Sequence, residues 1–343
     1  MAIASAAGFI SLLGSPSDIY GGATIGITLR DMQTYVFVGE HDEGQHFHNR
    51  YFDPGIKRTN EHIKLYYAVL EHFDLQYRQL SIKTCSDIPE ELGASRSVAL
   101  TVALIRALQL HFDIGMYDNA QITEAAWSII RKLEVIGGEA PYAVANDDEA
   151  PPEQIIFKRI KENADKKLKD ITTAKLGKLY YMDFSGRELL RTQNMFSSVI
   201  QLPLPSMHLA LAVNGKHESL PESMRIVYEN NEKKRDTINE LMQDSGKLAR
   251  LGAQEFNKEK PNIKKIGQLM TKSHDNCLEL MKKLGADVSD GVKDMRSIAL
   301  RTGALGISQA GHGSIAVLYT DDKVVGALQK KGYHVILLSG GAA

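Results

Sequence analysis

A mixed α+β fold of two layered domains is predicted by three observations. Short segments rich in apolar and small residues, typical of strands, lie between longer segments with the spacing of an amphipathic helix. Loops rich in glycine and serine separate several of these segments. The length of 343 residues is what two domains of ordinary size require. A shift in composition near residues 185–200 sets the expected boundary, which gives domains of residues 1–190 and 191–343.

The first domain is expected to contain strands and helices in mixed order. The strands are assigned to segments rich in apolar and small residues, at 3–13, 24–29, 35–39, 79–85 and 178–184. The helices are assigned where apolar residues recur three or four positions apart, at 60–73, 97–112, 122–135 and 152–170. Residues 137–152 contain Gly-Gly, Asn-Asp-Asp-Glu and Pro-Pro, so we expect a linker there.

The second domain is expected to be rich in helices. Helical spacing predicts four of them in succession, at 221–244, 245–256, 262–284 and 288–302. Strands are predicted at 207–213, 315–319 and 333–338. Several of these helices also carry charged residues on one side, which is the usual pattern of a helix face in contact with water.

The charge balance argues against large anionic partners. Lys and Arg number 41 against 42 Asp and Glu, and the net charge of −1 provides no field that would attract nucleic acid or an anionic membrane. No run approaches the roughly 18 apolar residues that a membrane-spanning helix needs. The two cysteines, Cys85 and Cys277, stand in no CxxC frame, which favours a reducing compartment over a disulfide framework. The N-terminus lacks the basic start of a signal peptide, so we expect a cytoplasmic protein.

The most informative loop, called the second loop below, is residues 89–97, Pro-Glu-Glu-Leu-Gly-Ala-Ser-Arg-Ser, directly before a predicted helix. Small residues let the backbone approach a ligand, and a helix N-terminus offers free N–H groups with a partial positive charge. This combination suits a nucleotide phosphate, and the hydroxyl of Ser97 could bind Mg²⁺. The alternative is an ordinary helix start with Ser95 as N-cap. No Gly-Lys-Ser/Thr closes the loop, so it is not a Walker A motif.

Two further loops have compositions that suit ligand binding. The first loop, residues 12–22, places Asp18 among turn-forming residues, where its carboxylate could accept hydrogen bonds from sugar hydroxyls. The alternative for Asp18 is an Asx-turn without a ligand. The third loop, residues 303–314, has four glycines in twelve residues, which suggests close backbone approach. A plain tight connection is its alternative.

Taken in order, the three loops resemble the three motifs of the GHMP kinase superfamily. The second loop fits the family pattern Pro-x-x-x-Gly-Leu-Gly-Ser-Ser-Ala-Ala without gaps, at Pro89, Gly93, Ser97 and Ala99. The first loop is similar to that of the glucuronokinase branch, Leu-Leu-Gly-Asn-Pro-Ser-Asp-Val-Tyr-Gly-Gly, and differs from it only at Ser15 and Ile19. Glucuronokinases also carry an Asp ahead of a strand that ends Tyr-Met-Asp-Phe, which Asp170 and residues 181–184 resemble at the same spacing.

The resemblance implies a fold and an activity. The implied fold has an N-terminal domain like domain 2 of ribosomal protein S5 and a ferredoxin-like α/β C-terminal domain. The implied activity is that of a sugar 1-kinase, which uses ATP and Mg²⁺ to phosphorylate the anomeric hydroxyl of a uronic acid or a related hexose. The similarity runs through most of the chain, although an insert at about 137–165 has no counterpart.

The resemblance also implies roles for individual residues. Asp170 would be the catalytic carboxylate, which accepts the proton or orients the nucleophile; its alternative is a solvated charge at the end of a Lys-rich helix. The nucleotide would be bound by Pro89, Gly93, Ala94, Ser95, Arg96 and Ser97. The substrate would be bound by Ser17, Asp18, Tyr20, Gly311 and Gly313. The metal would be bound by Ser97 and Glu134.

Four positions depart from the family pattern. The basic residue of the family's first strand falls on Phe9, the first serine of its Ser-Ser pair falls on Arg96, and Gln309 and His312 stand where glycines are expected. One account is that Arg96 takes over the lost charge and acts in catalysis, because a guanidinium suits phosphate recognition. The other is a pseudokinase that serves as a binding or structural subunit.

The expected partners are a small sugar and a nucleotide, without nucleic acid or membrane, while a protein partner or a homodimer is left open. An acidic sugar would need a cationic partner, for which Lys216 and Arg225 are candidates. His46 and His48 stand two apart in a polar loop without a third ligand, so we expect them to be solvated rather than metal-bound.

Overall fold

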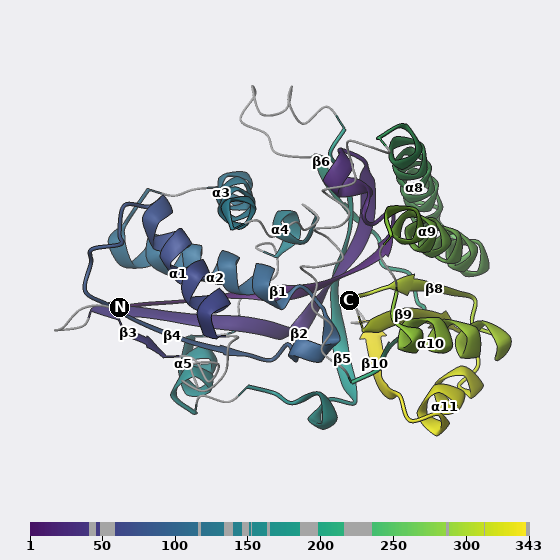
Figure 1. Cartoon of the computed structure of the whole chain (residues 1–343). Helices are drawn as coiled ribbons and strands as arrows, with labels where there is room; N and C mark the ends of the chain where they lie inside the picture. The colour runs from purple at the N-terminus through teal and green to yellow at the C-terminus, as the bar shows by residue number, and fades with distance from the viewer. Residues whose placement is uncertain are drawn as a thin grey trace.

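Helices cover both faces of one long, bent sheet in the computed structural model (Figure 1). The structure describes residues 1–40, 46–48, 59–115, 118–133, 140–145, 151, 153–162, 165–185, 198–215, 235–285, 288–311 and 313–340. Within these residues ten strands form a single sheet with the main order β3-β4-β2-β5-β10-β7-β9-β8, while β1 pairs with β2 and β6 with β5. The strands are β1 Ala2–Leu13, β2 Ala23–Glu40, β3 His46–His48, β4 Leu80–Ser86, β5 Thr173–Asp183, β6 Ser198–Leu202, β7 His208–Val213, β8 Gly306–Gln309, β9 Ser314–Tyr319 and β10 His334–Gly340.

The longest strand, β2, organises the first half of the sheet. It pairs with β1 along almost its full length, and on its other side residues 23–29 pair with β5 and residues 34–40 with β4. Separate strands at 24–29 and 35–39 were predicted, whereas the structure has one continuous strand. Two register shifts interrupt β1, after Ala7 and after Ser11, and such bulges bend a strand and change the direction of its side chains.

The helices of the first half lie on opposite faces of this sheet (Figure 1). Alternate residues of β2 explain the division, because side chains of a strand point to opposite faces. Val36 and Val38 belong to the same core as the helices above the sheet, whereas Tyr35 packs with Ile156 and Ile160 below it. The helices above are α1 Thr59–His72, α2 Arg96–Phe112, α3 Asn119–Lys132 and α4 Ala140–Val144, and the helix below is α5 Glu153–Glu162.

Four helices pack against the strands of the second half and against β1, β2 and β5. Helix α8 packs against β2 and β5, α9 against β8 and β1, α10 against β9 and α11 against β10. Single turns of 3-10 helix mark the loops at η1 Ser17–Tyr20 and η2 Glu90–Leu92 and the start of β5 at η3 Leu168–Asp170. The helices are α8 Arg235–Phe256, α9 Ile263–Leu284, α10 Asp290–Arg301 and α11 Lys323–Lys330.

Two predicted boundaries are wrong. A break at residue 245 was expected, but α8 continues through it, and Gly246 lets the helix approach β2 so closely that an added Cβ would lie 3.2 Å from the backbone nitrogen of Ala23. Residues 137–152 were expected to be a linker, but the described residues 140–145 contain α4, whose Tyr142 and Val144 are buried in the main core. The first part of the helix predicted at 221–244 lies outside the described residues.

The mixed α+β class with two layered parts is confirmed, and the two parts share one core. Leu12 and Phe184 of the first part belong to the same buried cluster as Leu209 and Ile336 of the second. Strand β10 joins the parts directly, because it pairs in parallel with β5 and antiparallel with β7. The boundary near residue 190 stays a prediction, since residues 186–197 lie outside the described ranges.

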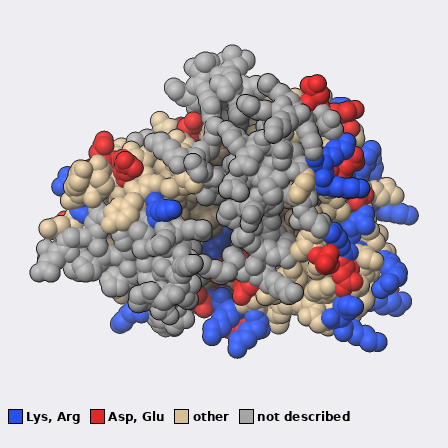
Figure 2. Space-filling view, in the orientation of Figure 1, with Lys and Arg blue, Asp and Glu red and all other residues tan. Residues whose placement is uncertain are grey.

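The described surface carries both signs of charge. On the face shown in Figure 2, basic and acidic side chains are interspersed over the helices of the second half. Ion pairs within single helices contribute to this pattern, such as Lys247 with Asp244 at 2.8 Å and Lys283 with Glu279 at 3.0 Å. None of the helices described has the length and apolar character that crossing a membrane requires.

Candidate active site

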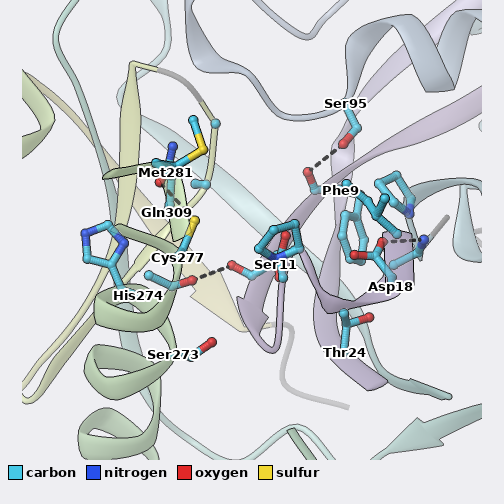
Figure 3. A pocket seen from close by; sticks show the side chains of 18 residues that line it. Phe9, Ser11, Asp18, Thr24, Ser95, Ser273, His274, Cys277, Met281 and Gln309 are labelled. Atoms are coloured by element: carbon cyan, nitrogen blue, oxygen red, sulfur yellow. Dashed lines mark hydrogen bonds between the residues drawn. The ribbon is translucent and has the colours of Figure 1, made fainter. Parts of the chain in front are cut away.

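A cavity lies where the three loops meet α9 (Figure 3). Its volume is about 190 Å³, far above the roughly 10–15 Å³ that a single water molecule needs. A small molecule therefore fits. We call it the three-loop cavity; its wall is formed by Phe9, Ser11, Ser15, Pro16, Asp18, Ile19, Thr24, Ser95, Ala140, Pro141, Ser273, His274, Cys277, Met281, Ser308, Gln309, Ala310 and Gly311.

Direct contacts hold the loops together around the cavity. The hydroxyl of Ser314 donates to the carbonyl of Leu92 at 2.7 Å, which joins the third loop to the second. At the same junction a Cβ added to Gly311 would lie 2.7 Å from the Cα of Gly93, so only glycine fits there. Ser308 in turn donates to the Ser11 carbonyl at 2.9 Å. The three loops singled out in the sequence therefore meet at one site.

The first loop places a buried carboxylate on the cavity wall. Asp18 is 2% exposed and lies in η1. Its Oδ2 accepts a hydrogen bond from the backbone N–H of Ala140 at 3.0 Å, whereas its Oδ1 has no hydrogen-bond partner. The donor belongs to α4, so the segment predicted to be an insert without a counterpart contributes to the site.

The second loop reaches the cavity through Ser95. This residue has φ 58° and ψ 36°, a left-handed conformation that costs a non-glycine residue free energy and is frequent at functional sites. Ser95 holds the N-cap position of α2, but its hydroxyl donates to the Phe9 carbonyl at 3.4 Å and makes no capping hydrogen bond to the helix. Because α2 has no side-chain cap in the described structure, the N–H groups of its first turn stay available.

Helix α9 forms a wall that the sequence did not reveal. Ser273 accepts a hydrogen bond from the backbone N–H of Gly14 at 2.8 Å, which fixes the helix to the first loop. His274 and Cys277 line the cavity beside it, opposite Phe9 and Asp18 (Figure 3). A signal was present, because polar residues at 273 and 274 interrupt the apolar stripe of this helix formed by Ile266, Met270, Leu280 and Met281.

Unsatisfied polar atoms concentrate in this wall. Among the described residues, buried side-chain atoms without a hydrogen-bond partner include Ser11 Oγ, Asp18 Oδ1, Thr24 Oγ1 and both ring nitrogens of His274. All four residues line the three-loop cavity. A buried polar atom without a partner costs about 1–3 kcal/mol, and such groups in a native structure call for an explanation. Each of these atoms has less than 1 Å² of accessible surface, so a ligand in the cavity would reach them only after the wall rearranges.

The titratable groups of the wall are shifted towards their uncharged forms. Burial raises the pKa of Asp18, although the hydrogen bond from Ala140 acts in the opposite direction. Burial and the nearby Arg296 cation lower the pKa of His274 to about 4, against the effect of Asp275. Burial raises the pKa of Cys277 to about 12. At neutral pH the imidazole and the thiol are therefore uncharged.

Comparisons with known proteins bear on this arrangement. Residues 253–335 match the model of the family described as GHMP kinases C terminal. A mevalonate kinase of L. major in complex with R-mevalonate has a TM-score of 0.62 at 16% identity, with 96% of this chain and 92% of that chain covered. This chain has the GHMP kinase fold. The family model covers the part that contains α9, β8 and β9, so the match includes one wall of the three-loop cavity.

Two further similar structures are of proteins named as sugar kinases. A Lactococcus lactis galactokinase complexed with galactose has a TM-score of 0.68 at 13% identity, with 98% of this chain and 92% of that chain covered. A D-glycero-D-manno-heptose 1-phosphate kinase from Bacteriodes thetaiotaomicron has a TM-score of 0.62 at 16% identity, with 98% and 94% covered. No curated protein matches the sequence. Identities this low establish the fold, and the activity has to be argued from the site.

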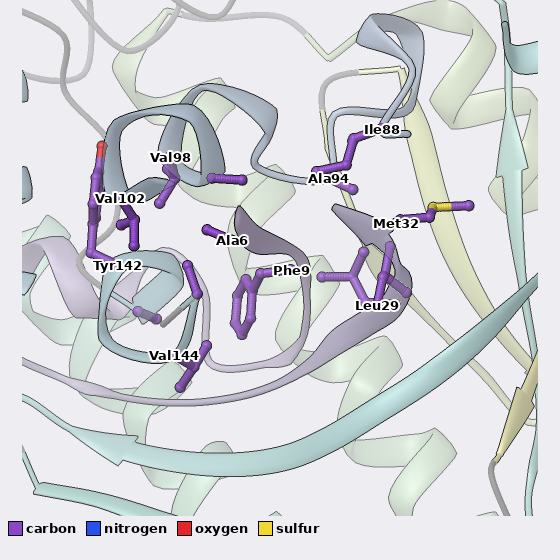
Figure 4. Packing of buried hydrophobic residues seen from close by; sticks show 14 of the residues in the cluster. Ala6, Phe9, Leu29, Met32, Ile88, Ala94, Val98, Val102, Tyr142 and Val144 are labelled. Carbon is purple, nitrogen blue, oxygen red and sulfur yellow. The ribbon is translucent and has the colours of Figure 1, made fainter. Parts of the chain in front are cut away.

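Phe9, which the resemblance aligned with a cation of the GHMP kinases, is part of the core. Its side chain is 3% exposed and packs among Ala6, Val98 and Val144 (Figure 4). The ring lies over Gly26, where an added Cβ would come within 2.2 Å of the Phe9 Cε2 atom. The glycine thus makes room for the ring, and the position is built for an apolar side chain.

Arg96 directs its guanidinium away from the three-loop cavity. It donates to the carbonyl of Ile88 at 2.6 Å and forms an ion pair with Asp165 at 3.5 Å, with both side chains mostly buried. Burial lowers the pKa of Arg96 to about 10, and the Asp165 carboxylate opposes this shift. The guanidinium remains the charged form at neutral pH. A role for Arg96 at a phosphate stays a prediction that would require it to leave these partners.

The predicted catalytic and metal-binding residues lie outside the cavity wall. Asp170 is exposed at the end of η3, which lies beside η2 of the second loop. Ser97 is exposed on the first turn of α2, and Glu134 lies outside the described residues. The described part of the chain holds no group of three side chains that could bind a metal ion. Because Mg²⁺ is usually held by one or two protein oxygens and by substrate phosphates, Ser97 fits a metal that arrives with a nucleotide.

The remaining predicted residues support the loops rather than line the cavity. Ser17 donates its hydroxyl to the Ala23 carbonyl at 2.8 Å, and Tyr20 packs against the core of the second half. The carbonyl of Gly313 accepts from the backbone N–H of Asn214 at 3.0 Å. Pro89 precedes η2, and Ala94 accepts from the backbone N–H of Phe9 at 3.2 Å. His312, Lys216 and Arg225 lie outside the described residues.

Proposed function

We propose that this protein is an ATP-dependent kinase that phosphorylates an alcohol group of a small sugar bound in the three-loop cavity. The observation that carries the proposal is the cavity at which the three loops meet, with Ser11, Asp18, Ser273 and Gln309 among its polar lining residues. Sugar hydroxyls both donate and accept hydrogen bonds, so they complement this mixture of groups. The GHMP kinase fold supports phosphoryl transfer as the reaction, by similarity to the galactokinase and the heptose phosphate kinase.

The nucleotide is assigned to the second loop. The backbone of Gly93, Ala94 and Ser95 leads into the uncapped start of α2, and a helix start of this kind attracts phosphate. Ser97 on the same turn would bind Mg²⁺ together with the nucleotide phosphates. The metal would neutralise charge that develops on the transferred phosphoryl group, while the loop and the helix start hold the nucleotide in position.

Asp170 is the proposed general base by the resemblance alone. Its place next to the second loop is compatible with this role, although it does not line the three-loop cavity. The similarity of the first loop to that of glucuronokinases directs the proposal to the anomeric hydroxyl of a uronic acid or a related hexose.

Turnover of a sugar panel with release of ADP tests the proposal. We expect ADP formation with ATP, Mg²⁺ and at least one hexose or uronic acid, and we expect Asp170→Asn to lower kcat by about 10²-fold or more without changing the thermal unfolding midpoint. The matched control is Asp118→Asn, an exposed carboxylate at the start of α3. Tight nucleotide binding without turnover of any sugar would contradict the kinase proposal.

A pseudokinase is the second candidate, and two observations favour it. Phe9 is a buried apolar residue where the resemblance implies a cation, and Arg96 is held by Asp165 rather than directed to the cavity. Loss of a group that stabilises transition-state charge costs about 10²–10³ in rate. A pseudokinase of this kind would show no ADP release above background. A thermal shift with ATP and Mg²⁺ separates a ligand-binding pseudokinase from a purely structural one, because binding to the folded state raises its stability.

A further inference from the structure

Three serines of the second half each make a hydrogen bond with the backbone of the first half around the three-loop cavity. All three are buried, with exposed fractions of 7% or less. We call this line of contacts the serine seam; Ser11 and Ser273, labelled in Figure 3, belong to its opposite sides. The bonds are those of Ser273 Oγ in α9 with the Gly14 N–H at 2.8 Å, Ser308 Oγ in β8 with the Ser11 carbonyl at 2.9 Å, and Ser314 Oγ in β9 with the Leu92 carbonyl at 2.7 Å.

The serine seam holds all three loops in place. Ser273 fixes the first loop to α9, and Ser314 fixes the end of the third loop to the second loop. In the third loop Gly311 approaches the second loop so closely that an added Cβ would lie 2.7 Å from the Cα of Gly93. Because each serine bonds a backbone group, the course of the loops rather than the identity of their side chains decides whether the seam closes.

Helix α9 changes its packing partners at the serine seam. Ile266 and Met270, which precede Ser273, belong to the main core, and that core contains residues of both halves. Leu280 and Met281, which follow Ser273, belong to a second cluster whose described buried members lie between residues 210 and 335. Apolar packing therefore joins α9 to both halves ahead of the cavity, whereas hydrogen bonds join the halves along it.

Water can replace the bonds of the serine seam when the halves separate there. Exchange of a hydrogen bond for one with water changes the free energy little, whereas separation of packed apolar surfaces has no such compensation. A local opening therefore breaks the seam more easily than the main core, which serves as a pivot. A ligand needs such an opening to reach the polar atoms of the wall, because Ser11 Oγ, Asp18 Oδ1 and Thr24 Oγ1 each have less than 1 Å² of accessible surface.

We propose that ligands enter the three-loop cavity by local opening of the serine seam, and that Ser273, Ser308 and Ser314 are positioning residues that hold the cavity closed. The inference goes beyond the proposed function and does not rest on it, because the opening is a property of the chain without a ligand. It assigns these serines an effect on access to the cavity that other serines of the second half do not have.

The thiol of Cys277 reports on the opening. It lines the cavity and is partly buried, and burial raises its pKa to about 12, so the reactive thiolate is scarce while the seam is closed. Opening of the seam hydrates the thiol and makes it reactive. The other cysteine of the chain, Cys85, is buried with Tyr35 and Ile156 in the first half and does not line the cavity, so it serves as the internal standard.

Labelling of the full chain with N-ethylmaleimide at pH 8 tests the inference, with peptide mass spectrometry to measure the rate at each cysteine. We expect Cys277 to react faster than Cys85 in the wild type. Each substitution in the seam should raise the Cys277 rate by about threefold to tenfold, because it removes one bond that is broken in the open state. The substitutions are Ser273→Ala, Ser308→Ala and Ser314→Ala.

The matched control is Ser289→Ala, which removes the N-cap of α10. Ser289 accepts from the backbone N–H of Val292 at 3.3 Å within the second half, so its bond stays intact when the seam opens. The variant should lose stability as other cap deletions do but keep the Cys277 rate of the wild type. The inference is overturned if Ser289→Ala accelerates Cys277 as much as the seam variants, if none of the seam variants accelerates it, or if Cys277 and Cys85 react at equal rates in the wild type.

Discussion

The two carboxylate oxygens of Asp18 lie in different environments. One carboxylate oxygen holds α4 through the Ala140 N–H, while the other is buried without a partner. Burial favours the protonated form, so its pKa in the folded state lies above its value in the unfolded chain. The folded state therefore binds the proton more tightly than the unfolded chain. By linkage, this contribution to stability is fully present below the unfolded-state pKa and is lost as the pH rises through the folded-state pKa.

Replacing Asp18 by Asn should remove this pH dependence. The amide oxygen can still accept from Ala140, but the side chain no longer ionises. At pH 7.5 we expect Asp18→Asn to have the higher free energy of unfolding, and we expect its advantage to shrink as the pH falls towards the ordinary aspartate pKa of 3.8. Urea denaturation at several pH values between 4.5 and 7.5 measures the difference.

The fully exposed Asp290 provides the control for this experiment. Its carboxylate contacts only Lys293 on the same helix among the pairs described, at 3.5 Å. The difference between Asp290→Asn and wild type should stay small at all pH values, because exposed pairs contribute little. An advantage of Asp18→Asn that does not change with pH, or that reverses at neutral pH, would contradict the assignment of a buried carboxyl group with a raised pKa.

Individual site residues were predictable where local chain geometry marks them. Asp18, Ser95 and Gly311 lie in loops whose spacing and glycine content signal ligand binding, and all three line the cavity. Thr24 carries no such signal, because a single hydroxyl in a strand is common, and Ser273 is marked only by its interruption of the apolar stripe of α9. They become site residues only because the folded sheet and α9 bring them to the same cavity. Their place there depends on the tertiary structure and cannot be predicted from local sequence.

Two neighbouring ion pairs hold the segment before η3 against α2 and the end of β4. We call this pair of interactions, made by Asp165 and Lys166, the clip. Asp165 accepts from the backbone N–H of Ser86 at 2.6 Å and pairs with Arg96, while Lys166 pairs with the buried Asp87 at 3.6 Å. The segment leads directly into η3 and therefore into Asp170. Arg96 thus positions a neighbouring element, and this accounts for a large charged side chain where GHMP kinases are expected to carry serine.

A double-mutant cycle tests the clip. Arg96→Ala and Asp165→Ala should each lower the free energy of unfolding by about 1–3 kcal/mol, because both leave a mostly buried charge without its partner. The double variant should be less destabilised than the sum, with a coupling of about 1 kcal/mol. Denaturation at pH 7 in urea measures all four proteins. Additive effects would contradict the clip.

Nucleotide binding by the same variants distinguishes the clip from a phosphate contact. A clip predicts that Arg96→Ala and Asp165→Ala reduce the ATP-dependent thermal shift to similar extents. A direct phosphate contact predicts that only Arg96→Ala reduces it, while Asp165→Ala leaves it equal or larger. The second outcome would restore the hypothesis that Arg96 replaces the missing cation of the first strand.

Elements with strong periodicity were predicted well, and short or continuous ones were not. Helices α1, α2, α9 and α10 match their predicted ranges within a few residues, because long amphipathic spacing is a strong signal. Strand β8 has only four residues inside a glycine-rich stretch, and β6 exposes Val199 and Ile200 rather than alternating. Strand β2 was predicted as two strands; residues 30–32 have no partner in β1, but the strand continues through this bulge and pairs again from Gln33.

The whole molecule depends on contacts between segments far apart in the sequence. The ten described strands form one sheet in which β10, from the C-terminal end, separates β5 from β7. The main core includes buried residues from β1 to β10, so neither half encloses it alone. Helix α8 packs on β1 and β2, α9 packs on β1, and the two helices pack on each other. The two parts predicted from composition share one sheet and one core, so we expect them to unfold as one cooperative structure.

This continuity predicts that the half-chains do not fold separately. A fragment of residues 1–190 lacks β10, α8 and α9, so it leaves β5 without its β10 partner and exposes apolar residues of the main core, each worth about 1.5–3 kcal/mol when buried. We expect this fragment to show no cooperative unfolding transition.

The full chain should unfold in one transition, with the fluorescence of its single tryptophan, Trp127 in α3, changing at the same urea concentration as the far-ultraviolet circular dichroism. Two separated transitions, or a fragment that unfolds cooperatively, would show that the boundary near residue 190 divides independent domains. Since the three-loop cavity takes its walls from both halves, coincident transitions would also mean that the site cannot form unless the whole chain has folded.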